Sequence, residues 1–238
     1  MNSLARRLFS FKRIAYLQNY NEYLKTKSNV ERAIPVVDGM TFRGIKDKDI
    51  PRVAQLITDA YSDDLSIVVG RNNLRYVREF WIKTLNYDNT VKNNFLITEI
   101  NNEVKGLLKL QDFAGQEKGL PISETLKIFP LSCVGKFVLT GLQLEITSIR
   151  SEMFEPYIDY VTVDPKARGQ KIAYNVMQYC EYIAEKRGAK RVSLIVNSDN
   201  TKAINLYLKL GYIITYEIKC PKYLNAGHQI NFKMEKYL

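Results

Sequence analysis

Apolar residues recur with different periods along the first half of the chain, and each period predicts a type of element. Residues 49–60 and 74–85 place apolar side chains at intervals of three and four, the spacing of a helix with one buried face. Asn101 and Asn102 separate two short apolar runs, which favours a β-hairpin. The strands predicted in this half are 41–45, 95–100 and 104–111.

The second half carries the stronger pattern. A helix over 168–187 is well supported, because its apolar residues from Ile172 to Ala184 fall on one face and Gly188 ends it. The segment 112–150 is harder to assign, and its apolar stretch at 126–144 predicts one or two helices. The other predicted elements are strands at 157–163, 192–196, 213–219 and 229–235 and a helix at 201–210. Together they indicate a single α/β domain.

Composition excludes several classes of protein. The 238 residues are 46% hydrophobic and 25% charged, as in an ordinary globular protein. The longest apolar stretch, 129–144, is shorter than the roughly 20 residues that cross a bilayer, so we expect no transmembrane segment. The three cysteines form no Cys-x-x-Cys pair and there is one histidine, His228. We therefore expect no disulfide framework, no metal and no Ser-His-Asp triad, and we place the protein in the reducing cytoplasm.

Positive charge is concentrated at the N-terminus. The formal net charge is +10, and residues 1–27 hold six Arg or Lys against one Glu. The remainder is too diffuse to indicate nucleic acid by itself, and it fits an anionic cofactor. We divide the chain into a basic arm at 1–39 and a globular domain at 40–238 with an insertion at 112–150. The arm is interpreted as a packed amphipathic helix, a mitochondrial targeting peptide or a membrane-surface segment, and these alternatives stay open.

A strand, a basic turn and a helix start follow one another at 161–173. The first N–H groups of a helix have no intrahelical partner and point outward with the positive end of the helix dipole. Arg168 adds charge there, and Gly169 lets a ligand approach the backbone. This arrangement predicts a site for a phosphorylated cofactor.

Two motifs resemble the signatures of the GNAT superfamily of acetyl-CoA-dependent N-acetyltransferases. The first signature, Arg/Gln-x-x-Gly-x-Gly/Ala after Val-x-Val, is matched at all positions but Lys171 by Val161-Thr162-Val163 and Arg168-Gly169-Gln170-Lys171-Ile172-Ala173. The second is matched by Asn200, Ala203, Leu206, Tyr207, Gly211 and Tyr212. The resemblance covers most of residues 41–235. It implies a mixed central sheet of about seven strands, flanked by helices and splayed at the cofactor cleft.

The resemblance also implies roles for individual residues. Acetyl-CoA would be the co-substrate, and a primary amine of a small molecule, peptide or protein would attack its thioester directly. The pantetheine arm would run along Val161, Thr162 and Val163. The pyrophosphate would lie on the turn formed by Arg168, Gly169, Gln170, Lys171, Ile172 and Ala173. Asn200 and Ala203 would line the thioester end.

The candidate catalytic residues are Tyr207 and Asp159. By resemblance Tyr207 would be the acid that protonates the leaving thiolate; its alternative is core packing. Strand alternation puts Asp159 on one face with Tyr157 and Val161, where it is either the base or a solvated carboxylate.

Lys171 departs from the family pattern, which usually has glycine at this position. Its side chain either turns outward and pairs with a cofactor phosphate or impairs the pocket. The alternatives to an enzyme are therefore a non-catalytic acyl-CoA-binding module and, from charge and the sixteen tyrosines, an RNA- or ribosome-associated protein. We expect acetyl-CoA and an amine as partners and leave a homodimer open.

Overall fold

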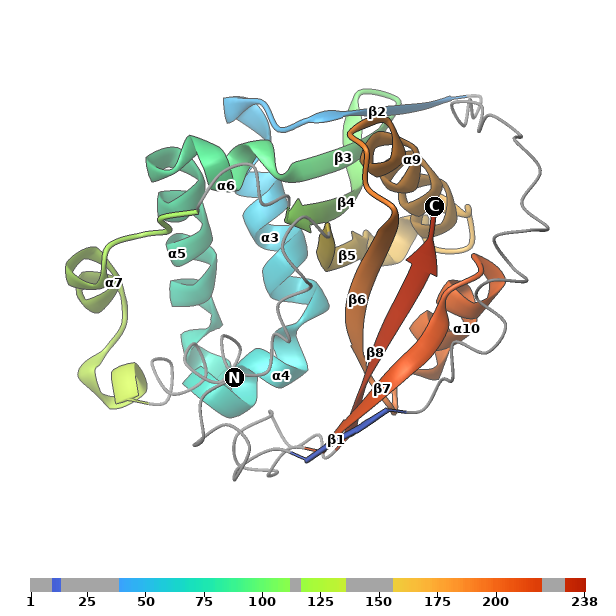
Figure 1. Cartoon of the computed structure of the whole chain (residues 1–238). Helices are drawn as coiled ribbons and strands as arrows, with labels where there is room; N and C mark the ends of the chain where they lie inside the picture. The colour runs from blue at the N-terminus through green and yellow to red at the C-terminus, as the bar shows by residue number, and fades with distance from the viewer. Residues whose placement is uncertain (1–9, 14–38, 112–116, 136–155, 220–229) are drawn as a thin grey trace.

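The protein is built around one eight-stranded mixed sheet (Figure 1). The computed structural model describes residues 10–13, 39–111, 117–135, 156–219 and 230–238. The strands are β1 (Ser10–Arg13), β2 (Met40–Gly44), β3 (Phe95–Ile100), β4 (Glu103–Gln111), β5 (Tyr157–Val163), β6 (Arg191–Asn197), β7 (Ile213–Lys219) and β8 (Ile230–Tyr237). Their order across the sheet is β1-β7-β8-β6-β5-β4-β3-β2. The predicted α/β fold with seven domain strands is confirmed, and β1 is an eighth.

Helices cover both faces of this sheet. They are α3 (Ile50–Ala60), α4 (Ser62–Val69), α5 (Leu74–Tyr87), α6 (Asn89–Asn93), α7 (Ile122–Ile128), α9 (Ile172–Lys186) and α10 (Thr201–Lys209). The described residues also include the short 3-10 helices η2 (Asp47–Asp49), η3 (Arg71–Asn73) and η4 (Pro165–Ala167). Helices α3 and α5 lie on one side of the strands and α9 on the other (Figure 1).

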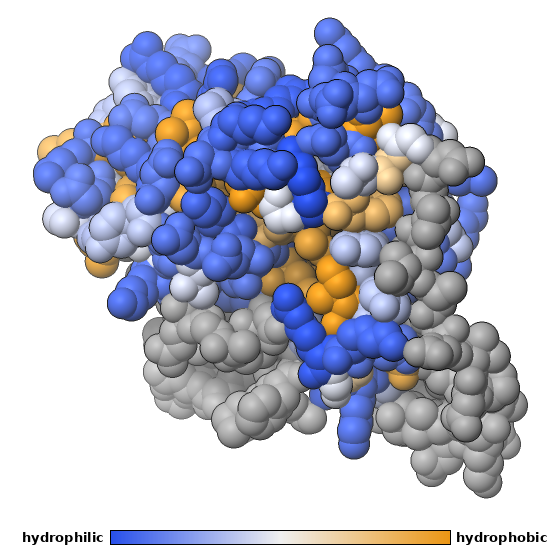
Figure 2. All heavy atoms as spheres, turned by 90° about the horizontal axis from the view of Figure 1, so that it is seen from above, coloured by the Kyte–Doolittle hydropathy of each residue, from blue (hydrophilic) through white to orange (hydrophobic). Residues whose placement is uncertain are grey.

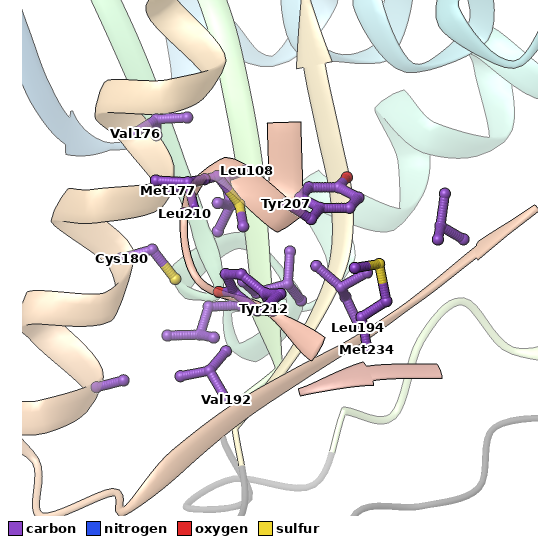
Figure 3. Close-up of a cluster of buried hydrophobic side chains, with 14 residues drawn as sticks. Leu108, Val176, Met177, Cys180, Val192, Leu194, Tyr207, Leu210, Tyr212 and Met234 are labelled. Atoms are coloured by element: carbon purple, nitrogen blue, oxygen red, sulfur yellow. The ribbon is translucent and has the colours of Figure 1, made fainter. Parts of the chain in front are cut away.

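Each face has its own hydrophobic core. On the side of α3 and α5, the buried core includes Ile57, Leu85, Phe95 and Leu107. On the side of α9 and α10, residues such as Leu108, Met177 and Met234 form the other core, shown in Figure 3. A third, smaller cluster lies under α4, α5 and α7. Polar side chains dominate the face seen from above, and apolar side chains show in a strip across its middle (Figure 2).

Strands β5 and β6 are the only parallel neighbours in the described sheet, and they separate early. Their register consists of two residue pairs, Tyr157 with Ser193 and Ile158 with Leu194. Beyond Ile158, β5 remains paired with β4 as far as Val163. The two strands therefore diverge at their carboxyl ends, as the resemblance implied.

Several sequence predictions hold closely. The hairpin between β3 and β4 turns at Asn101 and Asn102, whose φ angles of 52° and 61° are those that Asn tolerates and that the tight turn requires. Strands β3 and β7 have the predicted bounds, and α10 ends at Lys209, shortly before Gly211, where φ is +89°.

Other predictions are wrong in their details. Helix α9 starts at Ile172, four residues later than predicted, because residues 168–171 form an exposed turn. Helices α4 and α6 were not predicted. Residues 10–13 of the arm form a strand, not a helix, since they pair antiparallel with β7 over four residues. Most of the arm and much of the 112–150 insertion, including 136–150, lie outside the described residues.

Candidate active site

The gap between β5 and β6 is bordered by the three residues expected along the pantetheine arm. Val161 packs against the α9-side core, and Thr162 is buried on the opposite face. Val163 lies opposite Gly106 of β4 at the end of the strand. Because β6 has already diverged, this part of β5 is paired with β4 alone among the described strands. An extended ligand can take up the backbone hydrogen bonds that a neighbouring strand would otherwise make.

Asp164 fixes the end of β5. Its carboxylate accepts a hydrogen bond from the Lys166 N–H at 3.0 Å and pairs with Arg52 of α3 at 2.5 Å. The Lys166 N–H, together with the charges of Arg52 and Lys105, holds the pKa of Asp164 below its usual range. The start of the basic turn is therefore tied to the helix that covers the opposite face.

The turn itself is exposed and contains two left-handed backbone conformations. Arg168, Gly169, Gln170 and Lys171 are all exposed. Gly169 has φ of +85°, which favours glycine. Lys171 has φ of 58° and ψ of 18° and occupies the N-cap position of α9. Glycine is the residue that adopts this conformation most cheaply, so backbone strain is one physical reason for a glycine there. Lys171 keeps the turn geometry, with its side chain on the surface.

Helix α9 begins directly after this turn and is held close to the sheet. Ile172 is buried, and a Cβ placed on Gly106 would lie 2.6 Å from its Cγ2 atom. Ala173 is partly buried behind it. The N–H groups of residues 172–174 precede the first helical hydrogen bond, which Asn175 donates to the Lys171 carbonyl at 3.0 Å. These donors and the positive end of the helix dipole face the exposed basic turn.

Asn200 and Ala203 begin α10. The Asn200 side-chain oxygen accepts a hydrogen bond from the Ala203 N–H at 3.2 Å, so Asn200 caps the helix. Ala203 packs against the α9-side core. The structure thus gives both residues a role in forming the helix that carries Tyr207.

Tyr207 combines a buried ring with a hydroxyl on the side of β5 (Figure 3). The residue is 8% exposed, and its ring packs against that of Tyr212 with centroids 5.9 Å apart. Figure 3 shows its hydroxyl pointing toward β5, whereas the Tyr212 hydroxyl points toward α9. Burial raises the pKa of Tyr207 to about 12. The phenol therefore keeps its proton throughout the neutral range.

Asp159 lies on the α3-side face because of a β-bulge. Lys109 of β4 is opposite Tyr160, but the next residue, Leu110, is opposite Ile158, so Asp159 is the extra residue. Its carboxylate is 31% exposed and pairs with the Lys109 ammonium at 3.0 Å. The expectation that Asp159 shares a face with Val161 is therefore wrong, since the bulge breaks the alternation.

Three further tyrosines surround Asp159. Burial raises the pKa of Tyr157, and the charge of Asp159 and the phenols of Tyr61 and Tyr207 raise it further. Burial likewise raises the pKa of Tyr61, with added contributions from Tyr207 and Asp159. The ring of Tyr61 meets that of Tyr160 edge to face at 5.3 Å. Asp159 and Tyr207, assigned separately from the sequence, thus both act electrostatically on Tyr61 and Tyr157.

Sequence reasoning missed Lys109, Glu117 and Tyr61. Lys109 stands in a mainly apolar strand, and an ionisable residue in such a position is a signal for a buried ion pair. Tyr61 directly follows a predicted helix, and no pattern in the sequence distinguishes it from the other tyrosines.

Comparisons with known proteins agree with this geometry. Residues 138–212 match the model of the acetyltransferase (GNAT) family. The catalytic subunit NAA20 of the N-terminal acetyltransferase B complex of Arabidopsis thaliana is 41% identical over 66 residues, 27% of this chain and 38% of that relative. The chain thus spans well under half the length of this curated relative.

Solved structures share the fold at low identity. An N-acetyltransferase from Staphylococcus aureus Mu50 has a TM-score of 0.56 at 16% identity, covering 82% of this chain and 100% of the other. The PaiA N-acetyltransferase from Thermoplasma acidophilum, in complex with coenzyme A, has a TM-score of 0.52 at 13% identity, covering 84% and 99%.

The fold is that of the GNAT acetyltransferases. Residues 138–212, which contain both motifs, match the GNAT family model, so the resemblance seen in the two motifs is confirmed. Within the described residues, no helix is both long and apolar enough to span a bilayer, and no group of His, Cys, Asp and Glu side chains forms a metal site.

Proposed function

We propose that the protein transfers an acetyl group from acetyl-CoA to a primary amine by direct attack. The observation that carries this proposal is the divergence of β5 from β6 beside the basic turn of α9, with the Tyr207 hydroxyl directed at β5. Phosphate binding, an open strand edge and a proton donor then lie along one path. The family match at residues 138–212 supports the same activity.

The proposed cofactor contacts follow from the site. The N–H groups at the start of α9, with Arg168 and the ammonium of Lys171, bind the pyrophosphate. The backbone of Val161 and Val163 pairs with the pantetheine amides. Acetyl-CoA supplies the activated acetyl thioester when bound. The new amide bond forms as the carbon–sulfur bond breaks, and the thiolate needs a proton.

Tyr207 is the proposed source of that proton. Its pKa of about 12 keeps the phenol protonated at neutral pH, which is the form that an acid must have before it donates. Its ring is fixed by the core, so the hydroxyl is held in place before the substrate arrives.

Asp159 is the proposed base. The carboxylate is partly exposed, and its charge raises the pKa of Tyr61, as Tyr207 does. The structure places it in an ion pair with Lys109, which differs from a freely solvated carboxylate.

The acceptor class that we favour is the α-amine of a peptide or protein. NAA20 is by name the catalytic subunit of an N-terminal acetyltransferase complex, and the match to it motivates this choice. A small-molecule amine is the alternative outcome of an acceptor panel.

The test of this proposal measures thioester consumption with peptides and small amines for the wild type and Tyr207→Phe. We expect kcat to fall by about 100-fold in Tyr207→Phe, the typical contribution of a positioned acid, with acetyl-CoA binding unchanged. An unchanged kcat would remove Tyr207 from the mechanism. Binding of acetyl-CoA without turnover of any amine would favour a non-catalytic module.

We also propose that the arm stays attached to the folded protein in the cytoplasm. Strand β1 pairs with β7 over four residues, so removal of residues 1–21 as a targeting peptide would uncover a sheet edge. Sequencing the N-terminus of the protein isolated from its cells tests this, and a start after residue 13 would contradict it.

A further inference from the structure

A charged cluster lies inside the protein where β4, β5 and the segment at residue 117 meet. The Lys109 side chain is 6% exposed, and its ammonium contacts the Asp159 carboxylate at 3.0 Å and the Glu117 carboxylate at 2.9 Å. Asn94 donates a hydrogen bond to the other Glu117 oxygen at 2.7 Å. The cluster therefore holds one ammonium between two carboxylates.

Aromatic rings confine this ammonium. Sheet register places Lys109 between Phe95 of β3 and Tyr160 of β5, and its Nζ atom lies 6.0 Å and 5.9 Å from their ring centroids. Burial alone would lower the pKa of Lys109, but the charges of Asp159 and Glu117 outweigh it, and the net pKa is raised. Lys109 is thus a fixed positive charge that can move little.

The two carboxylates differ in what surrounds them. Glu117 is 15% exposed, and its contacts are Lys109 and Asn94. Asp159 is 31% exposed and lies among the phenols of the tyrosine cluster. Asp159 is therefore the more exposed of the two carboxylates that pair with Lys109.

We propose that Lys109 is a positioning residue that fixes the Asp159 carboxylate against the acceptor amine, with Glu117 securing Lys109 from the opposite side. This inference rests on the proposed acetyl transfer. A bulged residue has one ladder partner fewer than its neighbours, so its side chain needs another anchor. The Lys109 ammonium, held by rings and by Glu117, is that anchor. With two carboxylates and one ammonium, the cluster has net negative charge, which suits an acceptor that arrives as an ammonium ion.

A double-mutant cycle between Lys109→Met and Asp159→Asn tests this inference. If Lys109 acts through Asp159, each single variant lowers kcat by about 10- to 100-fold, and the double variant loses no more than Asp159→Asn alone. The KM for acetyl-CoA stays within about threefold of wild type, because the cofactor turn is separate from the cluster. Multiplicative losses in the double variant would overturn the inference.

Two further variants control for folding. Lys109→Arg keeps the charge and should recover most of the lost kcat, and failure to recover would count against the positioning role. Glu117→Gln leaves one acceptor oxygen for two donors, Lys109 and Asn94, so it should weaken the hold on Lys109 and lower kcat, but by less than Lys109→Met. A loss in Glu117→Gln as large as in Lys109→Met would show that the cluster only stabilises the fold.

The outcomes separate this inference from the proposed function. If the wild type acetylates an amine but the kcat losses of Lys109→Met and Asp159→Asn multiply in the double variant, the role of Lys109 is overturned and the proposed acetyl transfer remains. Absence of wild-type turnover with every amine would overturn both.

Discussion

Lys171→Gly is expected to stabilise the protein, because Lys171 holds a left-handed backbone conformation. With φ of 58° and ψ of 18°, a non-glycine residue loses about 1–2 kcal/mol relative to its preferred regions. Glycine removes that strain but gains freedom in the unfolded chain, which offsets about 0.5–1 kcal/mol. The side chain is exposed, so little packing is lost. We expect a net gain of about 0.5–1 kcal/mol, or a rise in Tm of about 1–4 °C.

The same substitution should weaken the cofactor site. Loss of an exposed ammonium beside the pyrophosphate should lower acetyl-CoA affinity by about 1.5- to 5-fold. Lys171→Ala is the matched control, since it removes the charge but keeps a Cβ at positive φ. Its affinity should fall to the same extent, and its stability should stay within about 0.5 kcal/mol of wild type.

Urea denaturation and calorimetric titration with acetyl-CoA measure the two effects separately. If Lys171→Gly has a lower free energy of unfolding than Lys171→Ala, the strain argument is refuted. Unchanged affinity in both variants would show that the Lys171 ammonium does not contact the cofactor.

Three other predictions concern the supports of the site. Gly106→Ala should destabilise the protein by about 1–3 kcal/mol, because the new Cβ would lie 2.6 Å from Ile172. Since Ile172 is the first residue of α9, the substitution should also weaken acetyl-CoA binding. Gly44→Ala, with open space at its Cβ, is the control. Asp164→Asn keeps an oxygen for the Lys166 N–H but loses the ion pair with Arg52, so it should cost about 0.5–1 kcal/mol at pH 7, measured by urea denaturation. Since the folded-state pKa of Asp164 is depressed, this difference should shrink as pH falls below about 4, and a constant difference would contradict the assignment. Deleting residues 1–13 removes four cross-strand pairs and should lower the free energy of unfolding by about 1–3 kcal/mol. We expect a lower Tm and, because the edge of β7 is uncovered, greater aggregation. An unchanged Tm would contradict the role of β1.

The sequence predicted the elements whose signals are local. Turn chemistry at Asn101 and Asn102 located a hairpin, and helical spacing located the buried face of α9. The two motifs identified the cofactor turn and Tyr207 because each combines several residues at fixed spacing.

The rest depends on contacts between distant residues. The bulge at Asp159 arises from the register between β5 and β4. Because simple alternation ignores such a bulge, it put Asp159 on the same face of the strand as Val161, which is wrong. The pairing of Lys109 with Glu117 and Asp159 joins three separate segments. The start of α9 was predicted too early because the motif residues from Arg168 form an exposed turn, which helical periodicity cannot distinguish from a first helical turn.

The most direct test of the account is the mass of a peptide incubated with the protein and acetyl-CoA. The account predicts that a peptide with a free α-amine gains one acetyl group, that the same peptide with a blocked amine gains none, and that Tyr207→Phe slows the reaction about 100-fold. Binding of acetyl-CoA with no acetylated product across peptides and small amines would contradict it.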